Sequence, residues 1–389
     1  MSPRATIVHV ITRLELGGAQ ENTLYTCQHL DRERFRVVLV YGPGGLMDDE
    51  ARGSERLEIV EVPELVRAIA PRSDSIALKK LTRVFRDLAL EHCQLGLRKD
   101  RILVHTHSSK AGVLGRLAAR RASIPKVVHG IHGFGFHAGQ HPLKRALFLN
   151  AERVAGRITD AFVSVSERIL GEARQLGIVP PGTPSEVIRS GMVLDPLRNG
   201  PGRVEARRAL GLPEDDEIVV SIANFKPQKD PLTLISAFAE LAAARPRARL
   251  VYAGDGGLRP QVERAVRQAR LVDRVHLLGW RRDIPQLLAA ADVVALSSIF
   301  EGLPRSAVQA VAARRPFVGT RVDGTPEIIR EGRDGYLVAP RDPSALAQAL
   351  ARALDLRPVA EDTEERVQAW EARRMVEAQE DLYERLLIR

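Results

Sequence analysis

The sequence predicts an α/β protein with two doubly wound domains, each a parallel sheet covered by helices on both faces. First, short apolar runs alternate with helix-compatible segments of ten or more residues, which is typical of parallel sheets. Second, the alternation stops at a stretch rich in proline and glycine, residues 178–202, and then starts again. Third, the chain has 389 residues, which at about 150 residues per domain suggests two or three domains.

The first domain is predicted to cover residues 1–195. Its apolar runs are short and are separated by turn signals, so we expect them to be buried strands. The predicted strands are 5–12, 35–41, 57–62, 101–107, 126–132 and 161–167, and the predicted helices are 18–30, 76–95, 110–121 and 142–158.

The second domain is predicted to cover residues 196–364. Strands are expected at 217–223, 248–254, 274–279, 291–298 and 315–320, each followed by a helix-compatible segment. The last 28 residues, 362–389, predict one long charged helix without a strand of its own. We expect this helix, from about residue 365 to 389, to pack back on the first domain.

The composition excludes several classes of protein. Apolar residues make up 44% and charged residues 28%, values that argue against intrinsic disorder. Two cysteines, Cys27 and Cys93, exclude a disulfide scaffold and fit a reducing compartment. No apolar run approaches the roughly 18 residues that a membrane-spanning helix needs. We therefore expect a cytoplasmic protein.

Basic residues are concentrated in one stretch of a chain whose formal net charge is +9. Residues 67–126 contain 14 Lys or Arg and four acidic residues. Such a stretch suits nucleic acid, anionic lipid or a phosphorylated substrate, and it also suits a plain solvated surface. Aromatic residues are 4% of the chain and none clusters with the basic stretch, so we expect no nucleic-acid binding.

Ligands of doubly wound domains bind beyond the carboxyl ends of the strands, so loops that follow strands are the candidate sites. Gly17 and Gly18 follow the first strand and open a helix, where backbone amides favour anions. Lys226 and Lys229 follow the first strand of the second domain and would neutralise a diphosphate. The alternatives are a tight turn for the glycines and two solvated lysines.

Glu301 stands in another loop of this kind, just before a helix expected to begin at Pro304. Its carboxylate would bind sugar hydroxyls, or it would simply cap the helix. Residues 254–256, Gly-Asp-Gly, follow a further strand and give a weak glycine signal. The segment 322–327 repeats the pattern of a loop followed by a proline-initiated helix, and a capped helix start explains it equally well.

Histidines gather in the first domain, at positions 105, 107, 129, 132, 137 and 141. His105 and His107 share a strand face because side chains alternate with period two. No cysteine and no well-spaced carboxylate accompanies the cluster. The sequence also lacks an Asp-x-Asp motif for a Mg²⁺-nucleotide. We expect no metal ion and no cofactor.

Taken together, these motifs resemble the retaining nucleotide-sugar glycosyltransferases of family 4, which have the GT-B fold of two Rossmann-like domains facing across a cleft. The second-domain motifs, which occur in family order, are N-x-x-x-x-K (224–229), GDG (254–256), LLGWRRD (277–283), EGLP (301–304), VDGTPE (322–327) and DGYLV (334–338). The first-domain runs 11–20, 105–119 and 127–133 resemble the same family.

The resemblance implies roles for individual residues. Glu301 matches the first acid of the family's E-x7-E signature and would contact the donor sugar, Lys229 would hold the diphosphate, and His132 would stand beside the transferred sugar. These three form the implied catalytic set. The implied donor-binding residues are Gly17, Gly18, Asn224, Lys226, Lys229, Gly254, Asp255, Gly302, Leu303 and Gln309, and the acceptor-side residues are His107 and Lys110.

Two positions depart from the family pattern. Gln309 replaces the second signature acid, and Asn224 replaces the arginine usually paired with the lysine at 229. Gln can still make hydrogen bonds to the ribose, but it loses a charge-assisted contact. Lys226 would restore the charge missing at 224.

The resemblance implies a retaining transferase that moves a sugar from a nucleotide-sugar, a UDP-sugar in preference to a GDP-sugar. The acceptor would be a carbohydrate or a polyprenyl-diphosphate-linked saccharide in cell-envelope, lipopolysaccharide or extracellular polysaccharide biosynthesis. The basic stretch would let the protein associate peripherally with the inner face of the cytoplasmic membrane. The rivals are a nucleotide-sugar 2-epimerase on the same fold and a non-catalytic sugar-nucleotide-binding partner protein.

Overall fold

A computed structural model describes residues 5–94, 99–136, 140–356 and 363–388. The chain divides into two compact units. Unit 1 contains residues 1–192 together with 372–389, and unit 2 contains residues 193–371. His137, one of the clustered histidines, lies outside the described residues.

Unit 1 is built on a seven-stranded sheet in the order β3-β2-β1-β4-β5-β6-β7, and every adjacent pair is parallel. The strands are nearly continuous apolar runs because helices cover both faces. They are β1 Ala5–Arg13, β2 Phe35–Gly42, β3 Glu58–Glu61, β4 Ile102–His107, β5 Lys126–Ile131, β6 Ala161–Ser164 and β7 Ser185–Val187.

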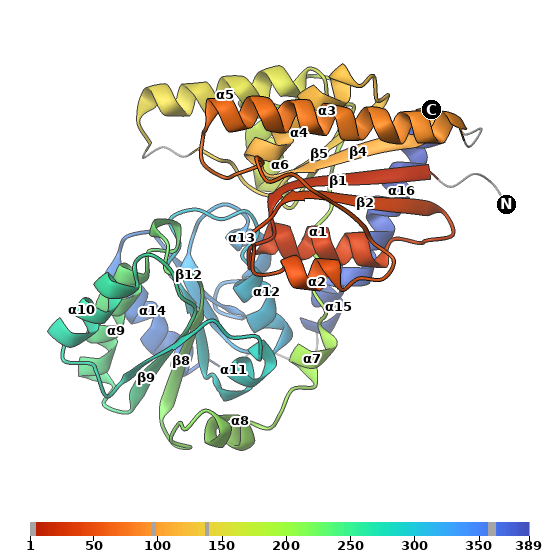
Figure 1. Cartoon of the computed structure of the whole chain (residues 1–389). Helices are drawn as coiled ribbons and strands as arrows, with labels where there is room; N and C mark the ends of the chain where they lie inside the picture. Colours follow the sequence, from red (N-terminus) through yellow and green to blue (C-terminus); the bar gives the residue numbers. More distant parts are fainter. Residues whose placement is uncertain (1–4, 95–98, 137–139, 357–362, 389) are drawn as a thin grey trace. The chain divides into compact units, whose positions relative to one another are not determined.

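The helices of unit 1 lie on both faces of this sheet, with α3, α4 and α5 on one face and α1, α2 and α16 on the other (Figure 1). They are α1 Gly18–His29, α2 Asp48–Arg52, α3 Pro71–Gln94, α4 Ser109–Arg121, α5 Pro142–Gly156, α6 Glu167–Gln175 and α16 Ala372–Ile388, with a 3-10 turn at Lys99–Arg101. Residues of β1 divide between the faces by alternation, so that Ile7 and Ile11 face α1 and α16 whereas Val8 and Val10 face α3 and α4.

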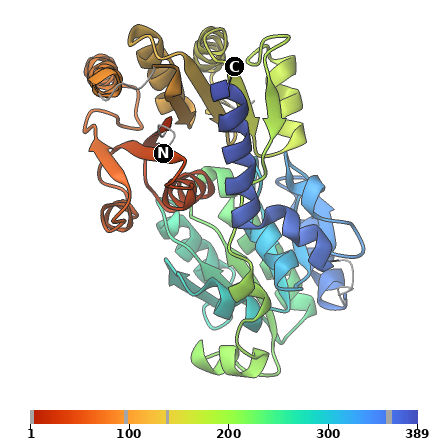
Figure 2. The same ribbon diagram turned by 90° about the vertical axis from the view of Figure 1, so that its right-hand side faces the viewer.

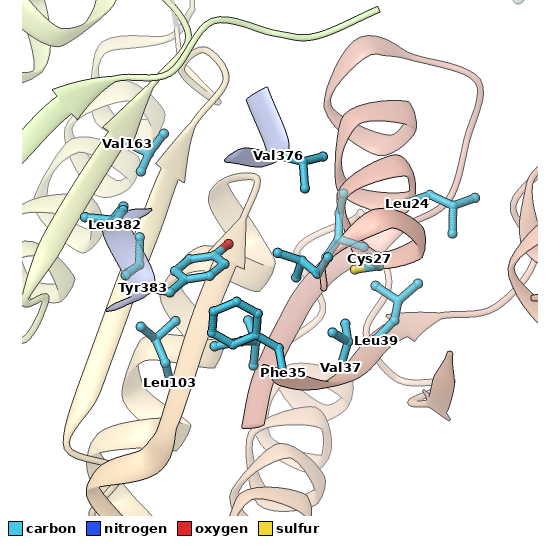
Figure 3. Close-up of a cluster of buried hydrophobic side chains, with 14 of the residues drawn as sticks. Leu24, Cys27, Phe35, Val37, Leu39, Leu103, Val163, Val376, Leu382 and Tyr383 are labelled. Carbon is cyan, nitrogen blue, oxygen red and sulfur yellow. The ribbon is translucent and has the colours of Figure 1, made fainter. Parts of the chain in front are cut away.

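The core beneath α16 is the largest apolar cluster of unit 1. Figure 3 shows the ring of Tyr383 beside Phe35 and Leu103, with Val376 and Leu382 from the same helix. Tyr383 is fully buried. In Figure 2 the blue helix that ends at the C-terminus lies along the strands of unit 1, which is how α16 completes this core.

Unit 2 repeats the plan with a six-stranded parallel sheet in the order β10-β9-β8-β11-β12-β13. The strands are β8 Glu217–Ile222, β9 Ala248–Ala253, β10 Val275–Gly279, β11 Val293–Leu296, β12 Phe317–Thr320 and β13 Gly335–Val338.

The helices of unit 2 also form two layers, one containing α9, α10 and α14 and the other α8, α11 and α12 (Figure 1). They are α7 Asp195–Arg198, α8 Arg203–Ala209, α9 Pro231–Ala244, α10 Arg259–Gln268, α11 Ile284–Ala290, α12 Arg305–Ala312, α13 Thr325–Ile328, α14 Pro343–Leu354 and α15 Thr363–Val367, with 3-10 turns at Pro227–Lys229 and Gln368–Trp370. This arrangement confirms the predicted α/β class with two doubly wound sheets.

The predicted single helix over 362–389 is wrong. The described part of this segment contains α15, a 3-10 turn and α16. Glu371 is extended, with φ −68° and ψ 133°. The break follows from packing, because Trp370 is buried in unit 2 while the N–H of Ala372 donates to the carbonyl of Met192 in unit 1 at 2.9 Å. An extended residue lets the chain pass from one unit to the other.

Smaller differences concern short elements. Strands β7 and β13 were not predicted, because three- and four-residue strands in loop-like sequence carry little periodic signal. The helix after Glu301 begins at Arg305 rather than at Pro304, which occupies the N-cap with φ −70° and ψ 110°.

Candidate active site

The strand order of each sheet reverses at one point, and parallel sheets bind ligands outside the carboxyl ends of the strands at that switch point. In unit 2 the switch lies between β8 and β11. The loops that leave these two strands are residues 223–230 and 297–304, and they carry Lys229 and Glu301.

Lys229 and Glu301 form an ion pair, in which the ammonium of Lys229 contacts Oε1 of the carboxylate. The Glu301 side chain is 7% exposed and that of Lys229 is 19% exposed, so water screens the pair only weakly. Ser298 adds a second donor, because its hydroxyl donates to the same carboxylate oxygen at 2.5 Å. The structure therefore fixes a carboxylate and an ammonium side by side at the switch point.

Backbone contacts hold both loops in place. The N–H of Glu301 donates to Oδ2 of Asp323 at 2.5 Å. The hydroxyl of Ser297 donates to the carbonyls of Lys229 and Asp230, at 3.0 and 2.7 Å. Asp230 has a left-handed backbone, with φ 45°, which turns the chain from the lysine into α9.

The Gly-Asp-Gly segment packs against the 223–230 loop. The N–H of Phe225 donates to the carbonyl of Asp255 at 2.9 Å. Gly254 has φ +149°, and a Cβ there would lie 1.9 Å from the carbonyl oxygen of Ala223. The Asp255 carboxylate pairs with Arg259 at 2.8 Å. Here the glycine is required by close backbone approach, and the aspartate is held within its own loop and helix.

The remaining donor-binding candidates of unit 2 lie close by in the fold. Gly302 accepts a hydrogen bond from the N–H of Gly324 at 3.1 Å, and Leu303 is buried. Gln309 lies partly buried on α12, the helix that follows Glu301. Oδ1 of Asn224 is buried and has no hydrogen-bond partner in the part of the chain that the structure describes. The N–H of Lys226 donates to the Asn224 carbonyl at 2.9 Å.

The switch point of unit 1 lies between β1 and β4. Gly17 and Gly18 follow β1, and Gly18 is the first residue of α1. His107 is the last residue of β4. The end of β1 contacts the residue before α4, because the hydroxyls of Thr12 and Ser108 lie 2.9 Å apart.

Imidazoles from three segments converge at this edge of the sheet. His9 on β1 is the register partner of His105 on β4, so both side chains leave the same face, and His107 leaves that face two residues later. His9 Nδ1 lies 2.9 Å from His107 Nε2, and His107 Nδ1 lies 3.1 Å from His132 Nε2. His105 Nδ1 lies 2.6 Å from the hydroxyl of Tyr383.

A small cavity opens beside these histidines within unit 1. His105, His107, His132 and Gly130 line it, together with polar side chains of α1 and α16. Gly130 makes the approach of the rings possible, because a Cβ there would lie 2.9 Å from His107 Nδ1 and 3.2 Å from His105 Nε2. Of the histidines grouped from the sequence, His105, His107 and His132 come together, whereas His129 contacts Thr106 and lies near Glu152. The sequence offered no signal for His9 or Tyr383.

Burial keeps these imidazoles neutral. It lowers the pKa of His9 to about 3, with the charge of Arg32 as a smaller cause, and the pKa of His132 to about 4. The pKa values of His105 and His107 lie well below the usual value, again mainly through burial. The cause is the cost of removing a cationic ring from water.

One group of described residues has the spacing of a metal site. Ring nitrogens of His9, His105 and His107 all lie within 4.8 Å of one another. Two of these rings already share a hydrogen bond at 2.9 Å, between His9 and His107. His105 contacts the hydroxyl of Tyr383 at 2.6 Å, so all three rings take part in hydrogen bonds.

Lys110, expected on the acceptor side, pairs with Asp74 and donates to the carbonyl of Ala68. It fastens the start of α4 to the loop before α3. Sequence reasoning missed two residues at the unit 2 site: Ser298, the last residue of the predicted strand 291–298, and Asp323, which lies inside the motif at 322–327. Their roles depend on loop geometry, which spacing does not show.

Two family models match the chain in succession. Glycosyltransferase Family 4 matches residues 16–195, and Glycosyl transferases group 1 matches residues 202–370. The chain belongs to the family 4 glycosyltransferases, and it is a glycosyltransferase with the GT-B fold. Both models describe transferases, which favours sugar transfer over the epimerase and the non-catalytic partner considered from the sequence.

A curated relative from Escherichia coli, UDP-Gal:alpha-D-GlcNAc-diphosphoundecaprenol alpha-1,3-galactosyltransferase, is 28% identical over 361 residues, which cover 90% of this chain and 88% of the relative. Among solved structures, sucrose-phosphate synthase from Thermosynechococcus elongatus has a TM-score of 0.83 at 22% identity and covers 99% of this chain and 100% of that one. Anabaena HepE in complex with UDP has a TM-score of 0.78 at 19% identity, covering 97% and 99%.

No helix within the described ranges is both long enough and apolar enough to cross a membrane.

Proposed function

We propose that the chain transfers a sugar from a UDP-sugar to a lipid-linked saccharide, with retention of anomeric configuration and without a metal ion. The observation that carries the proposal is the Lys229–Glu301 pair at the switch point of the unit 2 sheet. The pair lies inside the segment that matches the group 1 transferases. The name of the Escherichia coli relative supports the choice of donor and acceptor.

The reaction breaks the bond between the anomeric carbon and the diphosphate oxygen, and the diphosphate leaves with the bonding electrons. In this proposal Lys229 stabilises that negative charge, and Glu301 stabilises the positive charge on the sugar ring. The acceptor hydroxyl forms the new bond on the same face, and its proton goes to a phosphate oxygen of the leaving group. The buried pair is preorganised, so little reorganisation is needed during the reaction.

The other candidate residues take supporting roles in this proposal. Lys226 is assigned to the diphosphate, and Gly302, Leu303 and Gln309 to the sugar and ribose. Asn224 carries a buried carbonyl oxygen without a partner among described residues, which suits a hydrogen-bond donor on the ligand. From unit 1, the family resemblance assigns Gly17 and Gly18 to the diphosphate and His132 to the transferred sugar.

The first experiment is a transfer assay with UDP-galactose, UDP-glucose, UDP-GlcNAc and GDP-mannose, using GlcNAc-diphosphoundecaprenol as acceptor. We expect transfer from a UDP-sugar, insensitive to EDTA, giving an α-linked product by NMR. K229A and E301A should each lower kcat by about 10²–10³-fold. K80A is the matched control, because Lys80 belongs to unit 1, where its Nζ lies 2.7 Å from Glu64 Oε1. Full activity of K229A and E301A would overturn the assignment, as would strict dependence on a divalent cation.

We also propose peripheral association with an anionic membrane, through α5. Leu143 is 76% exposed and Leu147, one turn later, is 60% exposed. Lys144 and Arg145 lie on the same exposed turn, so apolar and cationic residues occur together there. That combination suits insertion at an anionic lipid surface.

Co-sedimentation with vesicles of phosphatidylglycerol and phosphatidylethanolamine tests this surface. We expect binding to rise with phosphatidylglycerol content and to fall in the variant L143S/L147S. L46S is the control, because Leu46 is 58% exposed but lies outside α5. Binding that is equal at all lipid compositions, or unchanged in L143S/L147S, would contradict the proposal.

A further inference from the structure

The histidines of unit 1 belong to a longer hydrogen-bonded chain that ends on the C-terminal helix. The bonds between His132 and His107 and between His107 and His9 continue to Tyr383 on α16, because His9 Nε2 lies 3.5 Å from the Tyr383 hydroxyl. The last of these contacts is long. The same hydroxyl lies 2.6 Å from Nδ1 of His105.

At the Tyr383 end of this series of hydrogen bonds, the donor and the acceptor can be assigned. The hydroxyl of Tyr383 donates to Oε1 of Gln379 at 2.9 Å. The Nε2 of the same Gln379 amide donates to the hydroxyl of Thr26 at 3.2 Å. A hydroxyl has a single proton. The oxygen of Tyr383 is therefore an acceptor toward His9 Nε2 and His105 Nδ1.

The assignment at Tyr383 then determines the donor and the acceptor of each hydrogen bond from His9 to His132. Each neutral imidazole carries one N–H and one acceptor nitrogen. If His9 donates through Nε2, its Nδ1 accepts from His107 Nε2–H, and His107 Nδ1 accepts from His132 Nε2–H. At the far end, His132 Nδ1 is left without a proton.

We propose that Tyr383 and Gln379 of α16, acting through His9 and His107, hold His132 in the tautomer whose Nδ1 is unprotonated. His132 then presents an acceptor, and it takes a hydrogen bond from a hydroxyl group of the ligand. His9, His107 and Tyr383 are positioning residues. The proposal rests on the proposed function only in naming that ligand as the transferred sugar.

Two observations at the cavity fit this polarity. His132 Nδ1 and His105 Nε2 are buried and have no hydrogen-bond partner within the described chain, and both residues line the same cavity. By the same reasoning, His105 donates through Nδ1 to Tyr383, so its Nε2 also carries a lone pair. The cavity thus receives two acceptor nitrogens, and its volume of about 20 Å³ admits one hydroxyl group of a ligand. A cation would also bind to the lone pairs of these two nitrogens, so the test measures the tautomer of each histidine.

The test is a long-range ¹H–¹⁵N correlation spectrum of the ¹⁵N-histidine-labelled full chain at pH 7.5, without substrates. We expect His132 to show protonated Nε2 and unprotonated Nδ1. Y383F, which keeps the ring but removes the oxygen, should turn the His132 signal into a mixture of tautomers. Y41F is the matched control, because the buried Tyr41 donates to Glu61 and takes no part in the hydrogen bonds that join the histidines to Tyr383.

A protonated Nδ1 in the unsubstituted protein, or an unchanged His132 signal in Y383F, would overturn the proposal. In the transfer assay Y383F should lower kcat several-fold with donor KM unchanged. H107F, which removes both ring nitrogens, should lower it further, and H107Q should recover part of the loss. Because the spectra need no turnover, they remain decisive if the chosen substrates are wrong, and failure of the transfer assay alone bears on the proposed function.

Discussion

Lys229 and Glu301 make an ion pair across a separation of 72 residues, from loops that follow two adjacent strands, β8 and β11. The two residues lie in different loops, and they meet because the sheet places β8 and β11 side by side. A buried carboxylate with an ammonium and a hydroxyl on one oxygen is a fixed electrostatic element. Removing a residue that contacts the Glu301 carboxylate should therefore lower kcat.

Removing the hydroxyl of Ser298 tests the support of that carboxylate. S298A deletes the donor at 2.5 Å from Glu301 Oε1 while leaving Lys229 in place. A charge-assisted hydrogen bond contributes about 1.5–3 kcal/mol, so we expect kcat to fall about tenfold or more. S344A is the control, because Ser344 donates to the exposed Glu240 at 2.9 Å. An unchanged kcat in S298A would show that the contact has no part in turnover.

Replacing Asp323 with asparagine should have little effect on stability, whereas replacing it with alanine should be destabilising. Its carboxylate accepts the N–H of Glu301, and its φ is +40°. D323N keeps an acceptor and a residue type that tolerates left-handed backbone, whereas D323A loses both. We expect D323A to lower the free energy of unfolding by about 2–3 kcal/mol and to weaken donor binding. Urea unfolding and donor titration check this, and equal effects of the two substitutions would contradict it.

Two glycine substitutions should have opposite signs. G254A places a Cβ 1.9 Å from a carbonyl oxygen at φ +149°, so it should destabilise unit 2 strongly. G171A fills open space within α6, where no atom lies within 4 Å, and should stabilise unit 1 by about 0.5–1 kcal/mol. Thermal unfolding of both variants measures the difference, and a stable G254A would contradict the close approach.

The buried pair of Arg116 and Glu152 predicts a large cost for removing one partner. Arg116 is fully buried and its NH2 lies 2.5 Å from the Glu152 carboxylate. E152A leaves a buried guanidinium without its anion and should lower the free energy of unfolding by about 3–5 kcal/mol. The double variant R116M/E152L should lose much less, because it buries no charge. Chemical denaturation of both variants distinguishes a desolvated pair from a dispensable one.

Stability should fall in mild acid because of the buried histidines. In the unfolded chain their pKa is about 6.5, whereas the folded values for His9 and His132 are about 3 and about 4. Below pH 6.5 the unfolded state therefore binds more protons, and each such histidine costs up to about 1.4 kcal/mol per pH unit until its folded pKa is reached. Urea unfolding from pH 7.5 to 4.5 should show a plateau and then a decline. H9Q should reduce the slope, and H29Q, at an exposed position, should not.

Much of this fold was predictable because most of its strands are continuous apolar runs. The run at 5–12 corresponds to β1, Ala5–Arg13, and the run at 248–254 to β9, Ala248–Ala253. β13, Gly335–Val338, was quoted as a motif but not predicted as a strand, because four residues after a turn have no measurable period.

The sequence was sufficient to identify individual residues of the site, but not to predict which of them contact one another. Lys229 and Glu301 were both identified as loop residues that follow strands, and their pairing required the order of strands in the sheet. His105 and His107 were placed on one face by alternation alone. His9 joins them because β1 is the neighbour of β4, and Tyr383 joins them through tertiary packing of α16. Spacing along the chain contains neither fact.

The position of α16 has a consequence for synthesis of the protein. Unit 1 is encoded by the two ends of the chain, since residues 372–389 belong with residues 1–192. The first six strands leave the ribosome long before the helix that covers Phe35, Leu103 and Val163. Until α16 has been synthesised, α1 and α2 cover only part of that apolar face, and the rest is exposed to aggregation or to chaperones. A chain that stops at residue 371 would lack α16 and would leave the core of unit 1 incomplete.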